Sequence, residues 1–134
     1  MASAKVDEFM TGYCKLARVE PPTAEADGAY VLRFDGKYAV RFGSDHRNRL
    51  LLRHDFAQLR DEPARREALE RLLRINLFLS GRKRSTLSLD QPSSTPFLYE
   101  VVALDETDAT EGFKTVTAFV NEVAAFHRAL DGRY

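Results

Sequence analysis

Two segments of alternating side chains around Asp35-Gly36 constrain the fold of this chain more than any other feature. Residues 29–34 and 38–42 place aromatic or aliphatic side chains at every second position, as a half-buried strand does. Aspartate followed by glycine tolerates the positive φ angles of a tight turn, so the two segments predict an antiparallel hairpin. The side chains expected on its apolar face are Tyr30, Leu32, Phe34, Tyr38, Val40 and Phe42.

Three further segments predict strands that extend this hairpin into a sheet. Residues 50–56 begin with three leucines, which makes the start of that strand apolar on both faces. Residues 86–90 alternate, and residues 97–104 are rich in β-forming side chains. Residues 91–96, between these last two strands, are expected to form a flexible connection.

Three other segments repeat apolar side chains at steps of three and four residues, the period of one helix face. They span residues 3–18, 61 to about 80, and about 107–132. Gly81 follows the second segment directly, where a left-handed cap is expected.

The resulting order indicates an α+β protein of the type α-β-β-β-α-β-β-α, with a five-stranded antiparallel twisted sheet and helices on one side. A chain of 134 residues buries about two thirds of its unfolded surface, which suffices for one core. Because no linker or repeat interrupts the pattern, residues 1–134 are expected to form a single domain.

Two features favour the cytoplasm. Residues 1–7 lack the basic start and apolar stretch of a signal peptide, and no apolar run approaches the roughly 20 residues that cross a bilayer. Cys14 is the only cysteine, which excludes an intrachain disulfide and suits a reducing compartment. We therefore expect a soluble protein without membrane contact.

The sequence contains no recognisable catalytic or metal-binding pattern. Three acidic pairs lie near predicted helix starts, where the helix dipole already favours negative charge. The three histidines lack the spacing of helical zinc sites, and the scattered glycines form no phosphate-binding loop. We expect no enzyme activity, no catalytic residue, no metal and no cofactor; a small hydrolase or transferase using Cys14 or a histidine such as His54 is an alternative.

Charge is distributed unevenly although the net charge is zero. Residues 41–84 hold 12 Lys/Arg and 6 Asp/Glu, a net +6, whereas residues 85–134 hold 3 and 8, a net −5. Such a basic segment suits a solvated helix face or a nucleic acid. A small nucleic-acid-binding module is thus a second alternative, disfavoured because the segment lacks interleaved aromatic side chains. Its contacts would be Arg74, Arg82, Lys83 and Arg84.

The second half of the 61–80 helix carries more apolar side chains than one helix face can hold. Leu72, Leu73, Ile75, Leu77, Phe78 and Leu79 leave little polar surface, so we expect this half to be buried almost all round. A dimer contact or a peptide groove would cover the excess, and a well-filled monomer core is the alternative.

Several stretches resemble the class I chaperones of bacterial type III secretion, the Tir chaperone family. They are residues 30–36, 50–52, 71–77, 86–90 and the helix around 119–130, and the similarity spans almost the whole chain. The most family-like part is the helix that ends in a leucine and asparagine cluster, followed by the Leu-Ser-Leu-Asp strand.

The resemblance implies a homodimer and a protein partner. The dimer would form through the second helix and the following strand, and the N-terminal region of a secreted effector would wrap it in extended form. The chaperone would keep that segment soluble and competent for secretion by strand addition and pocket filling. The implied dimer residues are Leu73, Ile75, Leu77, Phe78, Leu87 and Leu89, and the implied effector-binding residues are Phe9, Tyr13, Leu32, Phe34, Val40 and Phe42.

Overall fold

Three helices and five strands follow one another in the order that the sequence predicts. The structure is a computed structural model that describes residues 3–59, 62–79, 81 and 84–131. One short 3₁₀ turn, η1, was not expected. The elements are α1 (Ala4–Ala17), β1 (Tyr30–Phe34), β2 (Tyr38–Ser44), β3 (Leu50–Asp55), α2 (Glu62–Phe78), β4 (Thr86–Asp90), β5 (Thr95–Val102), η1 (Leu104–Glu106) and α3 (Ala109–Leu130).

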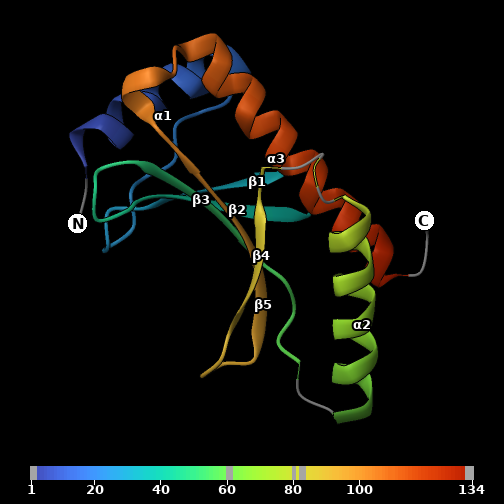
Figure 1. Ribbon diagram of the computed structural model, residues 1–134. Coiled ribbons are helices and arrows are strands. Elements are labelled where there is room, and N and C mark those ends of the chain that lie inside the picture. The colour runs from blue at the N-terminus through green and yellow to red at the C-terminus, as the bar shows by residue number, and fades with distance from the viewer. Residues whose placement is uncertain (1–2, 60–61, 80, 82–83, 132–134) are drawn as a thin grey trace.

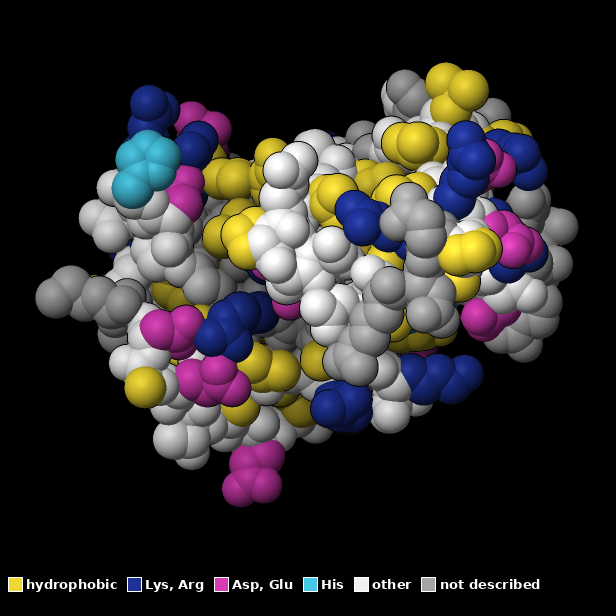
Figure 2. Space-filling model, turned by 90° about the horizontal axis from the view of Figure 1, so that it is seen from below, with side chains coloured by type: hydrophobic (Ala, Val, Ile, Leu, Met, Phe, Trp, Pro, Cys, Tyr) yellow, Lys and Arg dark blue, Asp and Glu magenta, His cyan; other side chains and the backbone are white. Residues whose placement is uncertain are grey.

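The strands form one antiparallel sheet in the order β1-β2-β3-β5-β4. Helices α1 and α3 lie against one face of the sheet, and α2 packs mainly against the C-terminal half of α3 (Figure 1). The opposite face carries no helix among the described residues, and hydrophobic side chains lie there among charged ones (Figure 2). The predicted α+β architecture is confirmed.

The predicted hairpin joins β1 to β2. Asp35 and Gly36 adopt φ angles of 54° and 65°, the left-handed conformation for which this dipeptide was identified. Tyr30 pairs with Phe42 and Leu32 pairs with Val40, so the apolar side chains share the face beneath the helices.

The prediction of a flexible connection at residues 91–96 is wrong. Residues 91–94 form a tight turn, and β5 begins at Thr95, which pairs directly with Asp90. The hydroxyl of Ser93 donates to the Asp90 carboxylate and hydrogen-bonds to Thr95, and these side-chain contacts give the turn a defined geometry. The strand ends earlier than predicted, at Val102, because the chain enters η1 at Leu104.

The core lies between the sheet and the helices α1 and α3. Each large apolar side chain buried there stabilises the fold by about 1.5–3 kcal/mol. Alternate residues of β2, β3 and β5 supply one side, and helical repeats of α1 and α3 supply the other. The fully or almost fully buried members include Val6, Met10, Val40, Phe42, Leu50, Leu52, Leu72, Leu98, Val116, Phe119, Val123 and Phe126.

Within one chain, the expected all-round burial of α2 does not occur. Leu72 is fully buried, whereas Leu73, Leu77 and Phe78 are 61%, 76% and 65% exposed. The reason is geometric: α2 has α3 as its main neighbour and therefore buries only one stripe. At the C-terminal end of α3, the Leu130 carbonyl oxygen accepts a hydrogen bond of 2.8 Å from the Arg71 guanidinium of α2. The remaining apolar face of α2 is left on the surface.

A pair of histidines joins the sheet to α3. His54 Nδ1 lies 2.7 Å from the Ala39 carbonyl oxygen, and the Nε2 atoms of His54 and His127 lie 2.8 Å apart. A carbonyl oxygen only accepts, so the neutral His54 ring carries its proton on Nδ1 and donates it to Ala39. Nε2 of His54 is then the acceptor, and Nε2–H of His127 donates to it. Burial lowers the pKa of both imidazoles, and for His127 the neighbouring His54 lowers it further; Asp55 and Asp131 oppose these shifts. The fold therefore favours the neutral form of the pair.

We predict that His127→Gln makes stability less dependent on pH between 7.5 and 5.5. Unfolded histidine takes up protons near pH 6.5. The folded pair resists protonation, so the unfolded state binds more protons as the pH falls and stability is lost until the folded pKa is passed. Urea unfolding across this range measures the effect. The control is His46→Gln, in the exposed turn between β2 and β3; equal pH dependence in both variants would contradict the prediction.

Candidate functional site

Tyr13 lies at the centre of an aromatic cluster between α1, α3 and the sheet. Its ring stacks on Phe9 and on Phe113, with centroids 6.1 Å and 5.7 Å away, and is tilted against Phe42 at 5.8 Å. Burial, with a smaller contribution from Cys14, raises the pKa of Tyr13 to about 12. The ring is therefore a neutral apolar surface, and it forms part of the wall of two clefts.

The first of these, which we name the α1–β1 cleft, has a volume of about 370 Å³. Its floor is largely apolar, and Val19 at its edge is 44% exposed. Arg33, Asp35 and Asn121 add polar groups around it. The apolar side chains that line it are Tyr13, Ala17, Val19, Leu32, Phe34, Phe113 and Val120.

An open strand edge adjoins this cleft. β1 is the first strand of the sheet and pairs only with β2 among the described residues. The backbone N–H and C=O groups on its other side have no strand partner, which makes it a template for an added strand. Leu32 and Phe34 of the same strand line the cleft. The α1–β1 cleft therefore offers backbone pairing and apolar contacts to one extended segment.

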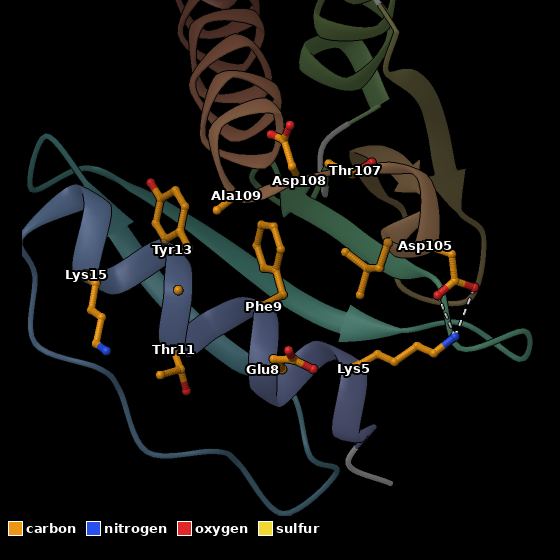
Figure 3. Close-up of a pocket in the computed structure, with 12 residues that line it drawn as sticks. Lys5, Glu8, Phe9, Thr11, Tyr13, Lys15, Asp105, Thr107, Asp108 and Ala109 are labelled. Atoms are coloured by element: carbon orange, nitrogen blue, oxygen red, sulfur yellow. Dashed lines mark hydrogen bonds and ion pairs between the residues drawn. The ribbon is translucent and has the colours of Figure 1, made fainter.

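The second cleft, which we name the α1–η1 cleft, lies on the other side of Tyr13 and has a volume of about 620 Å³. Phe9 and Tyr13 point from α1 toward the start of α3 (Figure 3). Lys5 forms an ion pair with Asp105 at 2.8 Å across one end. The floor is thus aromatic, and the rim carries both signs of charge. Its other lining residues are Glu8, Thr11, Gly12, Lys15, Leu104, Thr107, Asp108 and Ala109.

Two helix glycines shape this region, and the sequence analysis missed both. A Cβ atom on Gly12 would meet nothing within 4 Å, so its missing side chain leaves the α1–η1 cleft open. A Cβ atom on Gly112 would lie 2.6 Å from Cε1 of Phe9, so any side chain there would push the ring from its place against α3. Glycine lowers the stability of a helix, so a glycine inside a predicted helix indicates a packing or functional reason for its presence. That signal was available in the sequence for both positions.

We predict that Gly112→Ala destabilises the protein by about 1–3 kcal/mol, although alanine favours helices, because the methyl group overlaps Phe9. Chemical denaturation provides the measurement. In a Phe9→Leu background the clash is absent, so the same change should be neutral or stabilising. An equal loss in both backgrounds would show that Gly112 is needed for another reason.

The structure brings four of the six predicted effector-binding residues to the clefts. Phe9 and Tyr13 line the α1–η1 cleft, and Tyr13, Leu32 and Phe34 line the α1–β1 cleft. Val40 and Phe42 are different, because both have 0% exposure and belong to the core. Direct contact by these two is not possible in this structure; they support the cluster from below, as the Tyr13–Phe42 contact shows.

The residues predicted for a dimer interface fall into two groups. Leu73, Leu77 and Phe78 are exposed on α2, whereas Ile75 and Leu87 are partly buried against the core. Leu89 is also half-buried, on β4. The single chain therefore presents the α2 part of the predicted interface to solvent.

The surroundings of Cys14 and His54 do not favour the enzyme alternative. Cys14 is buried, and burial raises the pKa of its thiol, which disfavours the reactive thiolate. Both nitrogens of His54 are engaged, with Ala39 and His127. In the part of the chain that is described, no three His, Cys, Asp or Glu residues lie together as a metal site.

The basic segment is only partly described. Arg74 and Arg84 are exposed, whereas Arg82 and Lys83 lie outside the described residues. The aromatic residues of the two clefts come from α1, β1 and α3 and do not interleave with this segment. No helix in the described ranges combines the length and hydrophobicity that a membrane span requires.

Comparison with known proteins gives one family match. The model of the Tir chaperone protein (CesT) family matches residues 14–126. The search of curated proteins finds no match. The family match covers most of the chain, including the hairpin, α2 and most of α3.

Solved structures share the fold at low sequence identity. A chain of the ExsC–ExsE complex superposes with a TM-score of 0.70 and 18% identity, covering 97% of both chains. A chain of the HopA1–SchA chaperone–effector complex gives 0.67 and 17%, covering 91% of this chain and 92% of that one. The type III secretion chaperone SycH of Yersinia pestis, in complex with a fragment of YscM2, gives 0.64 and 15%, covering 90% and 98%.

Proposed function

Because this chain belongs to the Tir chaperone protein (CesT) family, we propose that it binds the N-terminal segment of a type III secretion effector. The segment lies in extended form across the two clefts and stays soluble and competent for secretion. The observation that carries the proposal is the placement of the open β1 edge beside the α1–β1 cleft. The chaperone acts in the bacterial cytoplasm and makes or breaks no covalent bond.

Strand addition holds the bound segment in extended form, and the side-chain contacts in the cleft set its register. Backbone hydrogen bonds to β1 hold an extended chain without regard to its sequence. Alternate side chains of the bound segment face the α1–β1 cleft, where apolar ones pack against Leu32, Phe34 and Phe113. The α1–η1 cleft beyond Tyr13 accommodates a further part of the segment. Wide apolar contact offsets the entropy lost when a disordered segment becomes ordered.

The working unit in this proposal is a homodimer. The exposed side chains of Leu73, Leu77 and Phe78 form an apolar patch on α2. A patch of this kind on a soluble protein is typical of a protein interface. The patch lies on α2, whereas the clefts lie at α1, so one surface serves assembly and the other serves effector binding.

Co-expression with the protein encoded beside this chain tests the proposal directly. Light scattering of the co-purified material should give a mass of two copies bound to one partner, and limited proteolysis should protect the partner's N-terminal region. A chain that purifies alone as a monomer would contradict both the effector-binding proposal and the dimer.

We predict that Gly12→Leu reduces partner binding at least tenfold without loss of stability. The space beside Gly12 admits a side chain, which would then fill the α1–η1 cleft. The matched control is Gly12→Ala, which should leave binding intact and stabilise α1 by about 0.5–1 kcal/mol. Calorimetric titration and thermal melting measure the two effects; full binding by the leucine variant would exclude this cleft.

We predict that Leu77→Asp dissociates the homodimer, weakening it about 100-fold, or roughly 2.7 kcal/mol, because a carboxylate would be buried without a counter-ion. Sedimentation velocity across a dilution series gives the dissociation constant. Leu77→Met preserves an apolar side chain of similar volume and should stay dimeric. If the aspartate variant remains a dimer, the interface lies elsewhere.

A further inference from the structure

Glu100 is an acidic side chain in the interior without a hydrogen-bond or ion-pair partner among the described residues. It lies on β5, on the helix-facing side of the sheet, and is only 6% exposed. A buried carboxylate without partners is costly, and native proteins normally satisfy such groups. Nearby, Glu122 of α3 accepts hydrogen bonds from the backbone and hydroxyl groups of Ser85, which fixes it in place. The Glu100 carboxylate is therefore free to accept hydrogen bonds from a group that enters through the space it lines.

Glu100 lines a third cavity, of about 260 Å³, between the end of β5, η1 and α3. Besides Glu100, the charged residues that line it are Glu106 of η1 and Arg84 from the loop before β4. Glu122 does not line the cavity but lies near enough to act on Glu100, so among the described residues the surroundings hold three separate carboxylates and one guanidinium. The excess of negative charge favours a cation. A metal ion does not fit the residues described, because no three ligand-bearing side chains converge.

The backbone around this cavity is open to an extended chain. Among the described residues, β4 pairs with β5 only from Thr95 to Tyr99, and residues 100–102 have a strand partner in β3 alone. Thr107 lines both this cavity and the α1–η1 cleft, so the two spaces adjoin at the start of α3. A segment lying in the α1–η1 cleft can therefore continue past Thr107 toward Glu100 at the end of β5.

We propose that the cavity at Glu100 is a subsite for one lysine or arginine side chain of the bound effector segment. The inference rests on the proposed function and adds a requirement for a basic residue to it. The ammonium or guanidinium group would donate hydrogen bonds to the Glu100 carboxylate, and Glu122 and Glu106 would add attraction. The flanking residues would lie along the edge of β5 at residues 100–102.

The protonation state of Glu100 makes the proposal measurable. Burial, and to a smaller extent repulsion from Glu122, raises the pKa of Glu100 to about 7, although Arg84 acts in the opposite direction. A proton and a cationic side chain therefore compete for the same carboxylate near neutral pH. Binding of the cation must lower this pKa, and by linkage its affinity must rise as the pH rises through 7.

The first test uses a short capped peptide with a central arginine between apolar residues, and its citrulline analogue, which has the same shape without charge. With the full chain, the arginine peptide should bind about fivefold more tightly near pH 8 than near pH 6, which corresponds to a fall of about one unit in the Glu100 pKa from its value of about 7. Carboxyl NMR signals should show that fall. The citrulline peptide should bind without this pH dependence.

Glu100→Gln should remove the preference for arginine over citrulline, and Glu20→Gln, in the exposed segment after α1, is the matched control. Equal binding of both peptides, or a Glu100 signal that neither peptide moves, would overturn the proposal. If the Arg84 side chain already fills the cavity, the unchanged protein should show no preference for the arginine peptide, and Arg84→Gln should create one. That outcome would also overturn the proposal.

The second test uses the co-purified complex, in which the Glu100 pKa should be lowered and Glu100→Gln should weaken binding about tenfold. A complex that forms normally and is unaffected by Glu100→Gln would contradict the subsite alone. If no partner co-purifies, the proposed function fails, and the peptide pair still decides whether the cavity binds a cationic side chain.

Discussion

The contact of Tyr13 with three phenylalanine rings determines how α1, α3 and the sheet meet. Phe9 extends the aromatic surface along α1, Phe113 belongs to α3 and Phe42 belongs to the core of β2. Close approach of Phe9 to α3 depends on Gly112, where any larger residue would collide with the ring. Because the helices meet at these rings, space is left on either side of Tyr13, and both clefts follow from that one contact.

Two of the buried polar sites in the described part of the chain differ in how their hydrogen bonds are satisfied. His54 and His127 satisfy each other and the Ala39 carbonyl group, so their role is complete within the chain. Glu100 has no such partner among the described residues, although Glu122 beside it is held by Ser85. A satisfied buried pair specifies packing, whereas a carboxylate facing a cavity is suited to a ligand. Whether a buried polar group already has its hydrogen-bond partners within the chain thus separates a structural site from a candidate binding site.

The two apolar surfaces of the chain are built differently. The clefts at α1 are concave and lined by aromatic rings, and the β1 edge beside the α1–β1 cleft offers backbone groups as well. The patch on α2 is a row of exposed side chains on a helix that is anchored through Leu72 and Arg71. A concave surface with an open strand edge suits an extended chain, and an exposed helix face suits a second folded surface. This difference supports the separate roles proposed for them.

The order of the elements, the hairpin at Asp35-Gly36 and the apolar repeat of α3 could all be predicted from the sequence, because they depend on local backbone preferences and on side-chain periodicity. The sequence also identified the family resemblance and four of the residues that line the clefts. Periodicity shows only that a side chain faces inward. It cannot tell the floor of a cleft from the core beneath it, and for that reason Val40 and Phe42 were misplaced. Only the tertiary structure brought Gly112 against Phe9 and His54 against His127, and left Glu100 facing a cavity without a partner, because each depends on residues distant in sequence.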